Sequence, residues 1–182
     1  MKQTSWFGLK VLAMVVLALV AAGCSCTPEM GARDVAVSLD NSLRDNTGKL
    51  KSVQVDIIAV NTGEIERWKQ ETLDVYWRPG GSNLALAQDK VVMKFDAMEN
   101  VPAKTLSVKD PCWAGWKAKN AMDLVVVANI PGYRGGGAGM ADSRRLVLPL
   151  DRCRWASASE PLQVRVSSAG VTSLTEPKPE KK

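Results

Sequence analysis

The sequence predicts a mainly β protein, an antiparallel β-sandwich with short helical insertions. Several short segments alternate apolar and polar residues, as half-buried strands do. Turn-forming residues separate these segments, for example at residues 45–48 and 79–81. Residues 124–127 are apolar without interruption, which is typical of a strand at the centre of a sandwich. Together these patterns favour two packed sheets.

In the first half of the chain we expect strands at residues 34–39 and 52–60, where every second residue is apolar. Residues 40–51, between them, are polar and rich in turn formers, which predicts a loop. A short helix is expected from Thr62, as its cap, to Gln70. The alternation of Leu73, Val75 and Trp77 predicts a further strand.

The second half predicts more short strands joined by turns. The expected pieces are strands at 87–95 and 104–108, a helical turn at 111–116, a buried strand at 122–130, a glycine-rich connection at 131–143, and strands at 145–150 and 162–166, the last continued around Val171.

The N-terminal region resembles a bacterial lipoprotein signal. Lys2 and Lys10 are positive, residues 11–22 are apolar, and small Gly23 precedes Cys24. A charged start, a short apolar core and a small residue at the cleavage point are the parts of a secretory signal. This layout predicts cleavage before Cys24 and attachment of membrane lipid to Cys24. The alternative is a transmembrane anchor over residues 6–23.

Acylation of Cys24 would hold the protein firmly on a membrane, because each buried CH₂ contributes about 0.8 kcal/mol and two or more chains suffice. Ser25 follows where lipoproteins retained in the inner membrane often have Asp. The expected location is therefore the outer membrane, facing the periplasm.

The expected organisation is a signal peptide at 1–23, a tether at 24–33, a β-sandwich domain at 34–175 and a charged, disordered tail at 176–182. Removing the signal leaves roughly 160 residues, which is enough for one domain with its own core.

Composition excludes several classes of function. The chain has no histidine, so it lacks the usual general base at neutral pH, Ser-His-Asp and Cys-His catalysis and His-ligated metals. Its formal net charge of +5 is too small for a nucleic-acid footprint. We expect a protein that is not an enzyme and has no cofactor, no metal and no nucleic-acid partner.

Three local motifs have ordinary explanations. The glycines at 134–139 lack the Lys-Ser or Lys-Thr and the helix that a phosphate loop needs, so they predict a flexible linker. The tryptophans could stack on sugars, but a domain this poor in phenylalanine needs them for packing. Glu64 and Glu66 are two residues apart on an expected helix and do not share a face.

The cysteines predict one disulfide. With Cys24 committed to lipid, Cys112 and Cys153 both lie in the folded region beside tryptophans, and an oxidising periplasm favours a bridge between them. Cys26 falls in the expected tether and receives no role.

Several of these segments, taken in order, resemble the outer-membrane lipoproteins of type VI secretion systems. A lipidated cysteine, a short strand and a polar loop with an Asp-x-x-Gly turn are followed by a V-x-V-x-I strand, here Val53 to Ile57. The apolar strand at 124–128 and the segment 144–155, with its basic-aromatic ending, continue the similarity.

The resemblance implies a non-enzymatic β-sandwich that anchors a type VI secretion membrane complex. Its implied partners are membrane lipid, through Cys24, and the periplasmic domain of an inner-membrane secretion subunit. The family's partner-contacting loop corresponds to residues 41–51, which implies Leu43, Arg44 and Lys49 as exposed contacts. The alternative is an envelope lipoprotein that binds a ligand or protein unrelated to secretion.

Overall fold

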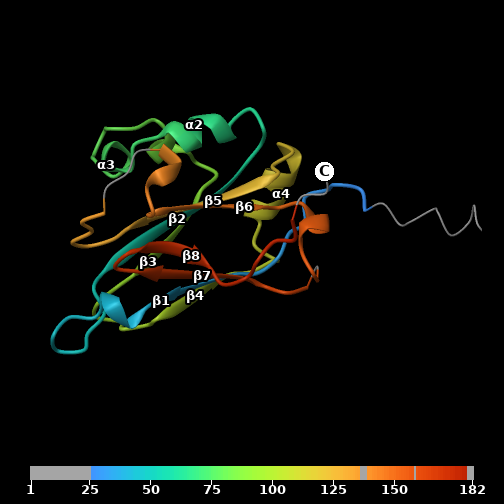
Figure 1. Cartoon of the computed structure of the whole chain (residues 1–182). Coiled ribbons are helices and arrows are strands. Elements are labelled where there is room, and N and C mark those ends of the chain that lie inside the picture. The colour runs from blue at the N-terminus through green and yellow to red at the C-terminus, as the bar shows by residue number, and fades with distance from the viewer. Residues whose placement is uncertain (1–25, 136–138, 158, 180–182) are drawn as a thin grey trace, which may run out of the picture.

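The computed structural model describes residues 26–135, 139–157 and 159–179, which form two four-stranded sheets packed face to face (Figure 1). One sheet has the order β4-β1-β7-β8 and the other β3-β2-β5-β6. Strands β1 and β7 pair in parallel and the other pairs are antiparallel. The strands are β1 (Val35–Leu39), β2 (Val53–Val60), β3 (Val91–Phe95), β4 (Ala103–Leu106), β5 (Asp123–Asn129), β6 (Arg145–Pro149), β7 (Leu162–Ser167) and β8 (Gly170–Ser173). The predicted fold class is confirmed.

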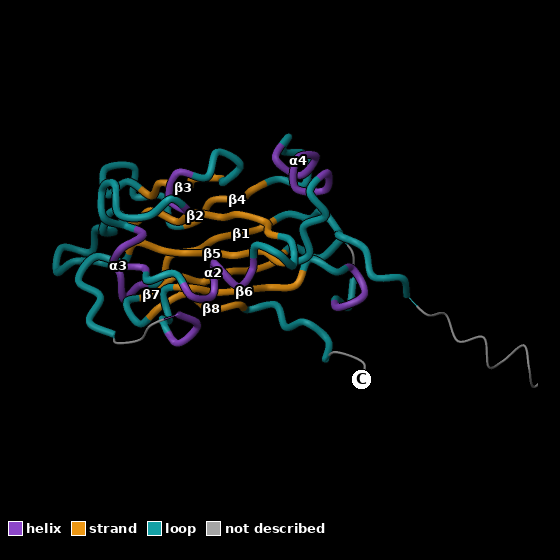
Figure 2. Tube along the Cα trace, turned by 90° about the horizontal axis from the view of Figure 1, so that it is seen from above, coloured by secondary structure: helices purple, strands orange, loops and turns teal. Residues whose placement is uncertain are grey.

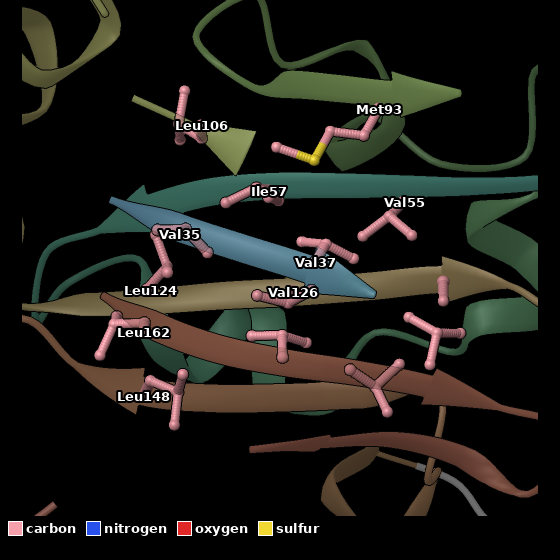
Figure 3. Packing of buried hydrophobic residues seen from close by; sticks show 14 of the residues in the cluster. Val35, Val37, Val55, Ile57, Met93, Leu106, Leu124, Val126, Leu148 and Leu162 are labelled. Carbon is pink, nitrogen blue, oxygen red and sulfur yellow. The ribbon is translucent and has the colours of Figure 1, made fainter. Parts of the chain in front are cut away.

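The main core fills the space between the two sheets. Alternate residues of each strand point into it because successive side chains of a strand face opposite sides of the sheet. Figure 3 shows Val35 and Val37 of β1 and Leu162 of β7 facing Ile57 and Val126 of the other sheet. This is the alternation that predicts these strands in the sequence.

A second, smaller core lies on the outer face of the β3-β2-β5-β6 sheet. Helices α2 (Ile65–Gln70) and α3 (Leu73–Tyr76) cover this face (Figures 1 and 2). The side chains buried beneath them are Ile58, Val60, Ile65, Trp68, Leu73, Tyr76, Val125 and Val127. Strands β2 and β5 are therefore buried on both faces, which explains the continuous apolar run in β5.

Two local predictions in this layer are wrong. The segment expected as a strand from Leu73 forms helix α3, in which Leu73 and Tyr76 are buried. A spacing of three residues brings both side chains onto one face of a helix, so they pack together on the sheet. Thr62 does not cap α2: the Asn61 side chain accepts hydrogen bonds from the N–H groups of Gly63 (2.9 Å) and Glu64 (3.0 Å) instead.

A buried polar cluster joins the helical layer to strand β2. Tyr76 donates its hydroxyl to Asp56 Oδ2 at 2.7 Å, and Lys90 Nζ lies 3.0 Å from the same oxygen. Gln54 donates to Asp56 Oδ1 at 2.8 Å. Burial, together with the hydrogen bond to Asp56 and the charge of that carboxylate, raises the pKa of Tyr76 well above its usual value. Asp56 therefore tolerates burial because three side chains satisfy it.

The disulfide joins Cys26 to Cys153, with their Cα atoms 5.7 Å apart, and the expected Cys112–Cys153 pair is wrong. The N-terminal segment runs beside the residues that follow β6: Gly31 N–H donates to Leu150 O at 2.8 Å, and Arg152 N–H donates to Glu29 O at 3.0 Å. This backbone pairing brings Cys26 to Cys153.

Cys112 has a free thiol at the start of helix α4 (Cys112–Ala118). The pKa of this thiol is raised to about 12, mainly by burial and, to a smaller extent, by a hydrogen bond to Asp110. The thiol is therefore protonated, and unreactive as a nucleophile, at neutral pH.

The described part of the expected tether is fixed to the domain by the disulfide, by these backbone bonds and by an ion pair between Glu29 and Arg152 at 3.1 Å. Lipid attachment at Cys24 lies outside the described residues. No helix in the described segments is long and apolar enough to cross a membrane.

Replacing Cys153 by Ser should lower the free energy of unfolding by about 2–4 kcal/mol, because the bridge closes a long loop and restricts the unfolded chain. Denaturant titration of the domain from Cys26 onwards measures this. Cys112→Ser is the matched control and should change stability by less than about 1 kcal/mol. A non-reducing peptide map that linked Cys112 to Cys153 would contradict the assignment.

Candidate functional site

Four connections between strands meet at the end of the sandwich opposite the disulfide. Their described residues are 40–52, 96–102, 130–135 with 139–144, and 168–169, and we call them the loop end. In Figure 1 the cyan loop that follows β1 projects from this end, and the blue N-terminal segment leaves at the other. The register agrees: Leu39, the last residue of β1, pairs with Val166 near the end of β7, and Val53, the first of β2, pairs with Phe95 at the end of β3.

The loop between β1 and β2 is ordered by its own side chains. Asp45 Oδ1 accepts hydrogen bonds from Thr47 N–H (2.8 Å), Thr47 Oγ1 (2.6 Å) and Lys49 N–H (3.0 Å). These bonds, those from Thr47 above all, hold the pKa of Asp45 below its usual value. Gly48 closes the turn at φ 80°, a conformation that favours glycine. The predicted Asp-x-x-Gly turn is present.

Leu43, which the resemblance implies as an exposed contact, is buried, and that expectation is wrong. Leu43 ends a short 3₁₀ helix (Asn41–Leu43). Its side chain and that of Leu50 belong to the main core, and they are 1 % and 2 % exposed, respectively. Two apolar side chains thus hold the loop at both ends of its projecting turn. Lys49 is exposed and Arg44 is half-buried.

The Arg44 guanidinium fastens this loop to a second one. Its Nε donates to Asn41 Oδ1 at 3.1 Å, and its Nη1 donates to Gly48 O at 2.7 Å and to Asn100 Oδ1 at 3.3 Å. All three acceptors are neutral oxygens. Arg44 is therefore held in place by groups that do not compensate its charge.

The second loop joins β3 to β4, and no sequence pattern indicates its role. Asn100, at φ 51°, also accepts a hydrogen bond from Leu50 N–H at 3.3 Å. Asp96 Oδ1 accepts from Met98 N–H at 2.7 Å and shapes the turn. Met98 is 93 % exposed and Val101 is 40 % exposed. This loop therefore carries two exposed apolar side chains and is joined to the Arg44 loop through Asn100.

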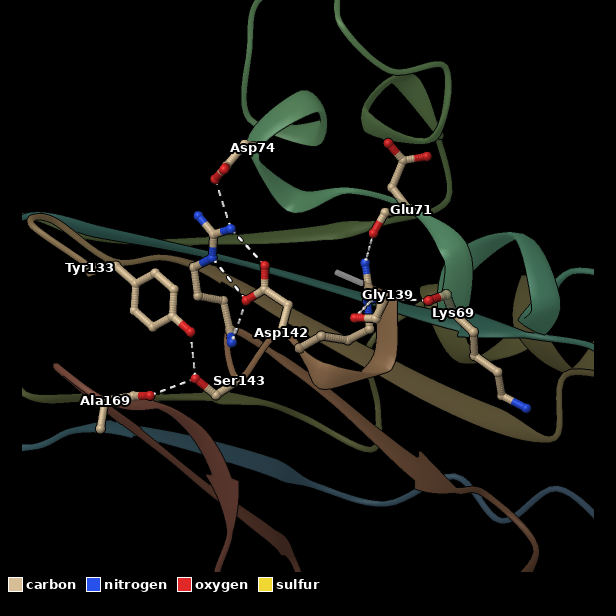
Figure 4. Close-up of polar contacts among 10 residues, drawn as sticks. Lys69, Glu71, Asp74, Tyr133, Gly139, Asp142, Ser143 and Ala169 are labelled. Carbon is tan, nitrogen blue, oxygen red and sulfur yellow. Dashed lines mark hydrogen bonds and ion pairs between the residues drawn. The ribbon is translucent and has the colours of Figure 1, made fainter. Parts of the chain in front are cut away.

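Hydrogen bonds continue across the other two connections (Figure 4). Ser42 Oγ accepts from Ser168 N–H at 3.0 Å, and Ser143 Oγ donates to Ala169 O at 2.6 Å. The hydroxyl groups of Tyr133 and Ser143 lie 2.7 Å apart. A Cβ at Gly170, where φ is 145°, would lie 2.4 Å from Ser143 O, so only glycine fits there. The loop end is therefore one connected structure.

Two arginines tie the glycine-rich connection to the helical layer (Figure 4). Arg144 binds Asp142 through Nε (3.0 Å) and Nη2 (2.6 Å), and Nη2 also lies 2.8 Å from Asp74 of α3. Arg145 donates to the backbone carbonyls of Lys69, Glu71 and Gly139. The flanks of the connection predicted as a flexible linker are thus fixed, while residues 136–138 lie outside the described residues.

Among the described residues, no group of three or more Cys, Asp or Glu side chains could hold a metal ion. Glu64 is engaged by Asn61 N–H (3.1 Å) and Lys119 (3.2 Å). The described tryptophans serve packing, as expected. Four of them are buried, namely Trp68, Trp113, Trp116 and Trp155, and Trp77 is half-buried.

Comparison with known proteins finds similarity in structure alone. No family model and no curated protein matches the chain by sequence. A chain of a structure described as a type VI membrane complex superposes with a TM-score of 0.52 at 15 % identity, covering 80 % of this chain and 99 % of that one.

A chain of the structure of the C-terminal domain of the type VI secretion protein TssM, from EAEC, gives a TM-score of 0.50 at 16 % identity over 78 % and 98 % of the two chains. Lip of Serratia marcescens, a membrane-bound component of the type VI secretion system, gives 0.49 at 10 % identity over 79 % and 96 %. The resemblance to type VI secretion proteins is thus confirmed at the level of the fold.

Replacing Asn100 by Gly should loosen the Arg44 loop, because it removes the shared acceptor yet permits the positive φ. Loss of about 1 kcal/mol of local stability would speed amide exchange at Leu50 roughly fivefold to tenfold. Hydrogen exchange measured by NMR tests this. Asn120→Gly, at the other described asparagine with a positive φ (55°), is the control and should leave Leu50 unchanged. Equal protection of Leu50 in both variants would refute the role of Asn100.

Proposed function

We propose that this protein is an outer-membrane lipoprotein, acylated at Cys24 and facing the periplasm, that anchors a type VI secretion membrane complex. It does so without catalysis, by binding the periplasmic domain of an inner-membrane subunit with its loop end. The fold shared with a chain of a type VI membrane complex supports the secretion role. The lipoprotein-like signal before Cys24 supports the anchor.

The observation that carries the proposal is the placement of the two functional ends. The disulfide fixes Cys26, two residues after Cys24, at one end of the sandwich, and the loop end lies at the other (Figure 1). A chain of two residues spans at most about 7 Å, so acylation at Cys24 would hold the disulfide end close to the membrane. The loop end would then point away from that membrane, toward a partner that reaches across the periplasm.

Within the loop end, we assign the contacts to Arg44 and Lys49 and remove Leu43 because it is buried. Hydrogen bonds hold the loop in shape before any partner binds, so binding orders little additional chain. Pre-organisation of this kind favours affinity, since ordering a loop at an interface costs free energy.

Replacing Cys24 by Ser in the full-length protein should abolish acylation and release the domain from the outer-membrane fraction. The reason is that the acyl chains provide the proposed hold on the bilayer, and no described helix is long and apolar enough to cross it. Fractionation and the lipid-dependent mobility shift measure the outcome. Cys112→Ser is the control. Persistence of Cys24→Ser in the membrane would favour the N-terminal transmembrane anchor instead.

Shortening the loop tests the contact surface. Replacing residues 45–49 by two glycines removes the projecting turn and keeps the buried side chains of Leu43 and Leu50. The variant should stay folded, by its thermal unfolding curve, and lose co-purification with the inner-membrane subunit. The same replacement at residues 79–82, in the helical layer, controls for loop shortening as such. Unchanged recovery of the complex would remove this site.

A further inference from the structure

The loop between β1 and β2 carries three cations, Arg44, Lys49 and Lys51. Several cations elsewhere contact carboxylates, for example Lys104 with Glu99 at 3.2 Å and Arg152 with Glu29 at 3.1 Å. Arg44, Lys49 and Lys51 form no such ion pair with any described residue, although Lys49 and Lys51 are exposed. This leaves three positive charges for an external group.

The carboxylates near these cations are engaged within the protein: Glu99 pairs with Lys104 at 3.2 Å, and three aspartates accept backbone hydrogen bonds. Asp40 accepts from Ser42 N–H at 2.9 Å, Asp96 accepts from Met98 N–H at 2.7 Å, and Asp45 accepts the bonds described above. The charge of Lys49 contributes a little to the low pKa of Asp45, after the hydrogen bonds from Thr47, but the two make no ion pair. The acids therefore shape the turns and leave the cations unpaired.

Arg44 is positioned to receive a carboxylate. Its Nε and Nη1 are fixed by Asn41, Gly48 and Asn100, while its Nη2 has no hydrogen-bond partner among the described residues. A guanidinium held in this way loses little conformational freedom when it binds, and its charge makes each hydrogen bond to a carboxylate strong.

The neighbouring turn supplies an apolar contact. Met98 and Val101 lie on the same turn as Asn100, which binds Arg44, and both are exposed to solvent. An unbranched methionine adapts to apolar partners of varied shape. The free Nη2 of Arg44 and these exposed apolar side chains are thus carried by two loops that a hydrogen bond links.

We propose that the loop end recognises an acidic segment of its protein partner that also carries an apolar side chain. A partner carboxylate binds Nη2 of Arg44, Lys49 and Lys51 attract the segment, and the apolar side chain packs on Met98. This inference rests on the proposed function and names the chemistry of the partner's binding segment.

The test measures binding of the purified domain to the periplasmic domain of the inner-membrane secretion subunit from the same organism. Raising salt from about 50 mM to about 500 mM should weaken binding roughly tenfold or more, because salt screens exposed charges. Met98→Asp should weaken binding about tenfold at low salt, since it adds a carboxylate and removes the apolar contact. Arg44→Gln should have a comparable effect and should reduce the salt dependence.

Leu86→Asp is the control for Met98→Asp, because Leu86 is also strongly exposed, at 72 %, but lies in the helical layer. It should bind like the unmodified protein. Since Met98 is almost fully exposed, its variant should fold normally even if Arg44→Gln disturbs the loop.

The two proposals fail in different ways. If the variant lacking residues 45–49 still binds, the proposed contact surface itself is wrong. If that variant fails to bind while Met98→Asp binds normally and affinity is insensitive to salt, only the acidic partner segment is refuted.

Discussion

Strands β2 and β5 are buried on both faces, and the two hydrophobic layers of the molecule share them. On one face their side chains meet β1 and β7 in the main core, and on the other they carry helices α2 and α3. Burial of aliphatic side chains stabilises by about 1.5–3 kcal/mol each, so these two strands supply much of the driving force for folding. Asp56 is the one charged residue of β2, and its side chain is satisfied by Tyr76, Lys90 and Gln54. The loops of the sandwich hold their positions because this central pair is fixed.

Rigidity at the loop end has a chemical origin. Short polar side chains, of which Asp45 and Asn100 do the most, hold backbone groups that no strand can satisfy. The loops therefore need no regular secondary structure to keep one shape. The consequence for recognition is that cations remain available at the surface while the neighbouring acids are used internally.

Much of the fold could be predicted from the sequence because alternation of apolar residues reports directly on half-buried strands. The sequence does not identify α3, because Leu73, Val75 and Trp77 fit the period of two of a strand, while Leu73 and Tyr76 also fit one face of a helix. Whether such a short segment forms a helix or a strand depends on how it packs against the sheet, and its sequence alone does not show this.

The site was less predictable, and for different reasons. Burial of Leu43 follows from its hydrophobicity, but a polar loop gives no sign of which residues reach the core. The partner of Cys153 depends on pairing between the N-terminal segment and residues 150–152, which are far apart in the sequence. Asn100 acts through a positive φ and two long-range hydrogen bonds, neither of which leaves a local pattern.

The disulfide also determines how the molecule bears tension. A pull applied at the N-terminus reaches Cys26 first, where the covalent path divides. One branch runs through Thr27 into β1, and the other crosses to Cys153 and enters β6 of the opposite sheet. The load is therefore shared between both sheets, and β1 cannot be peeled from its neighbours by the N-terminus alone. If the domain is anchored at Cys24 as proposed, the bridge would pass tension from the N-terminus to both sheets.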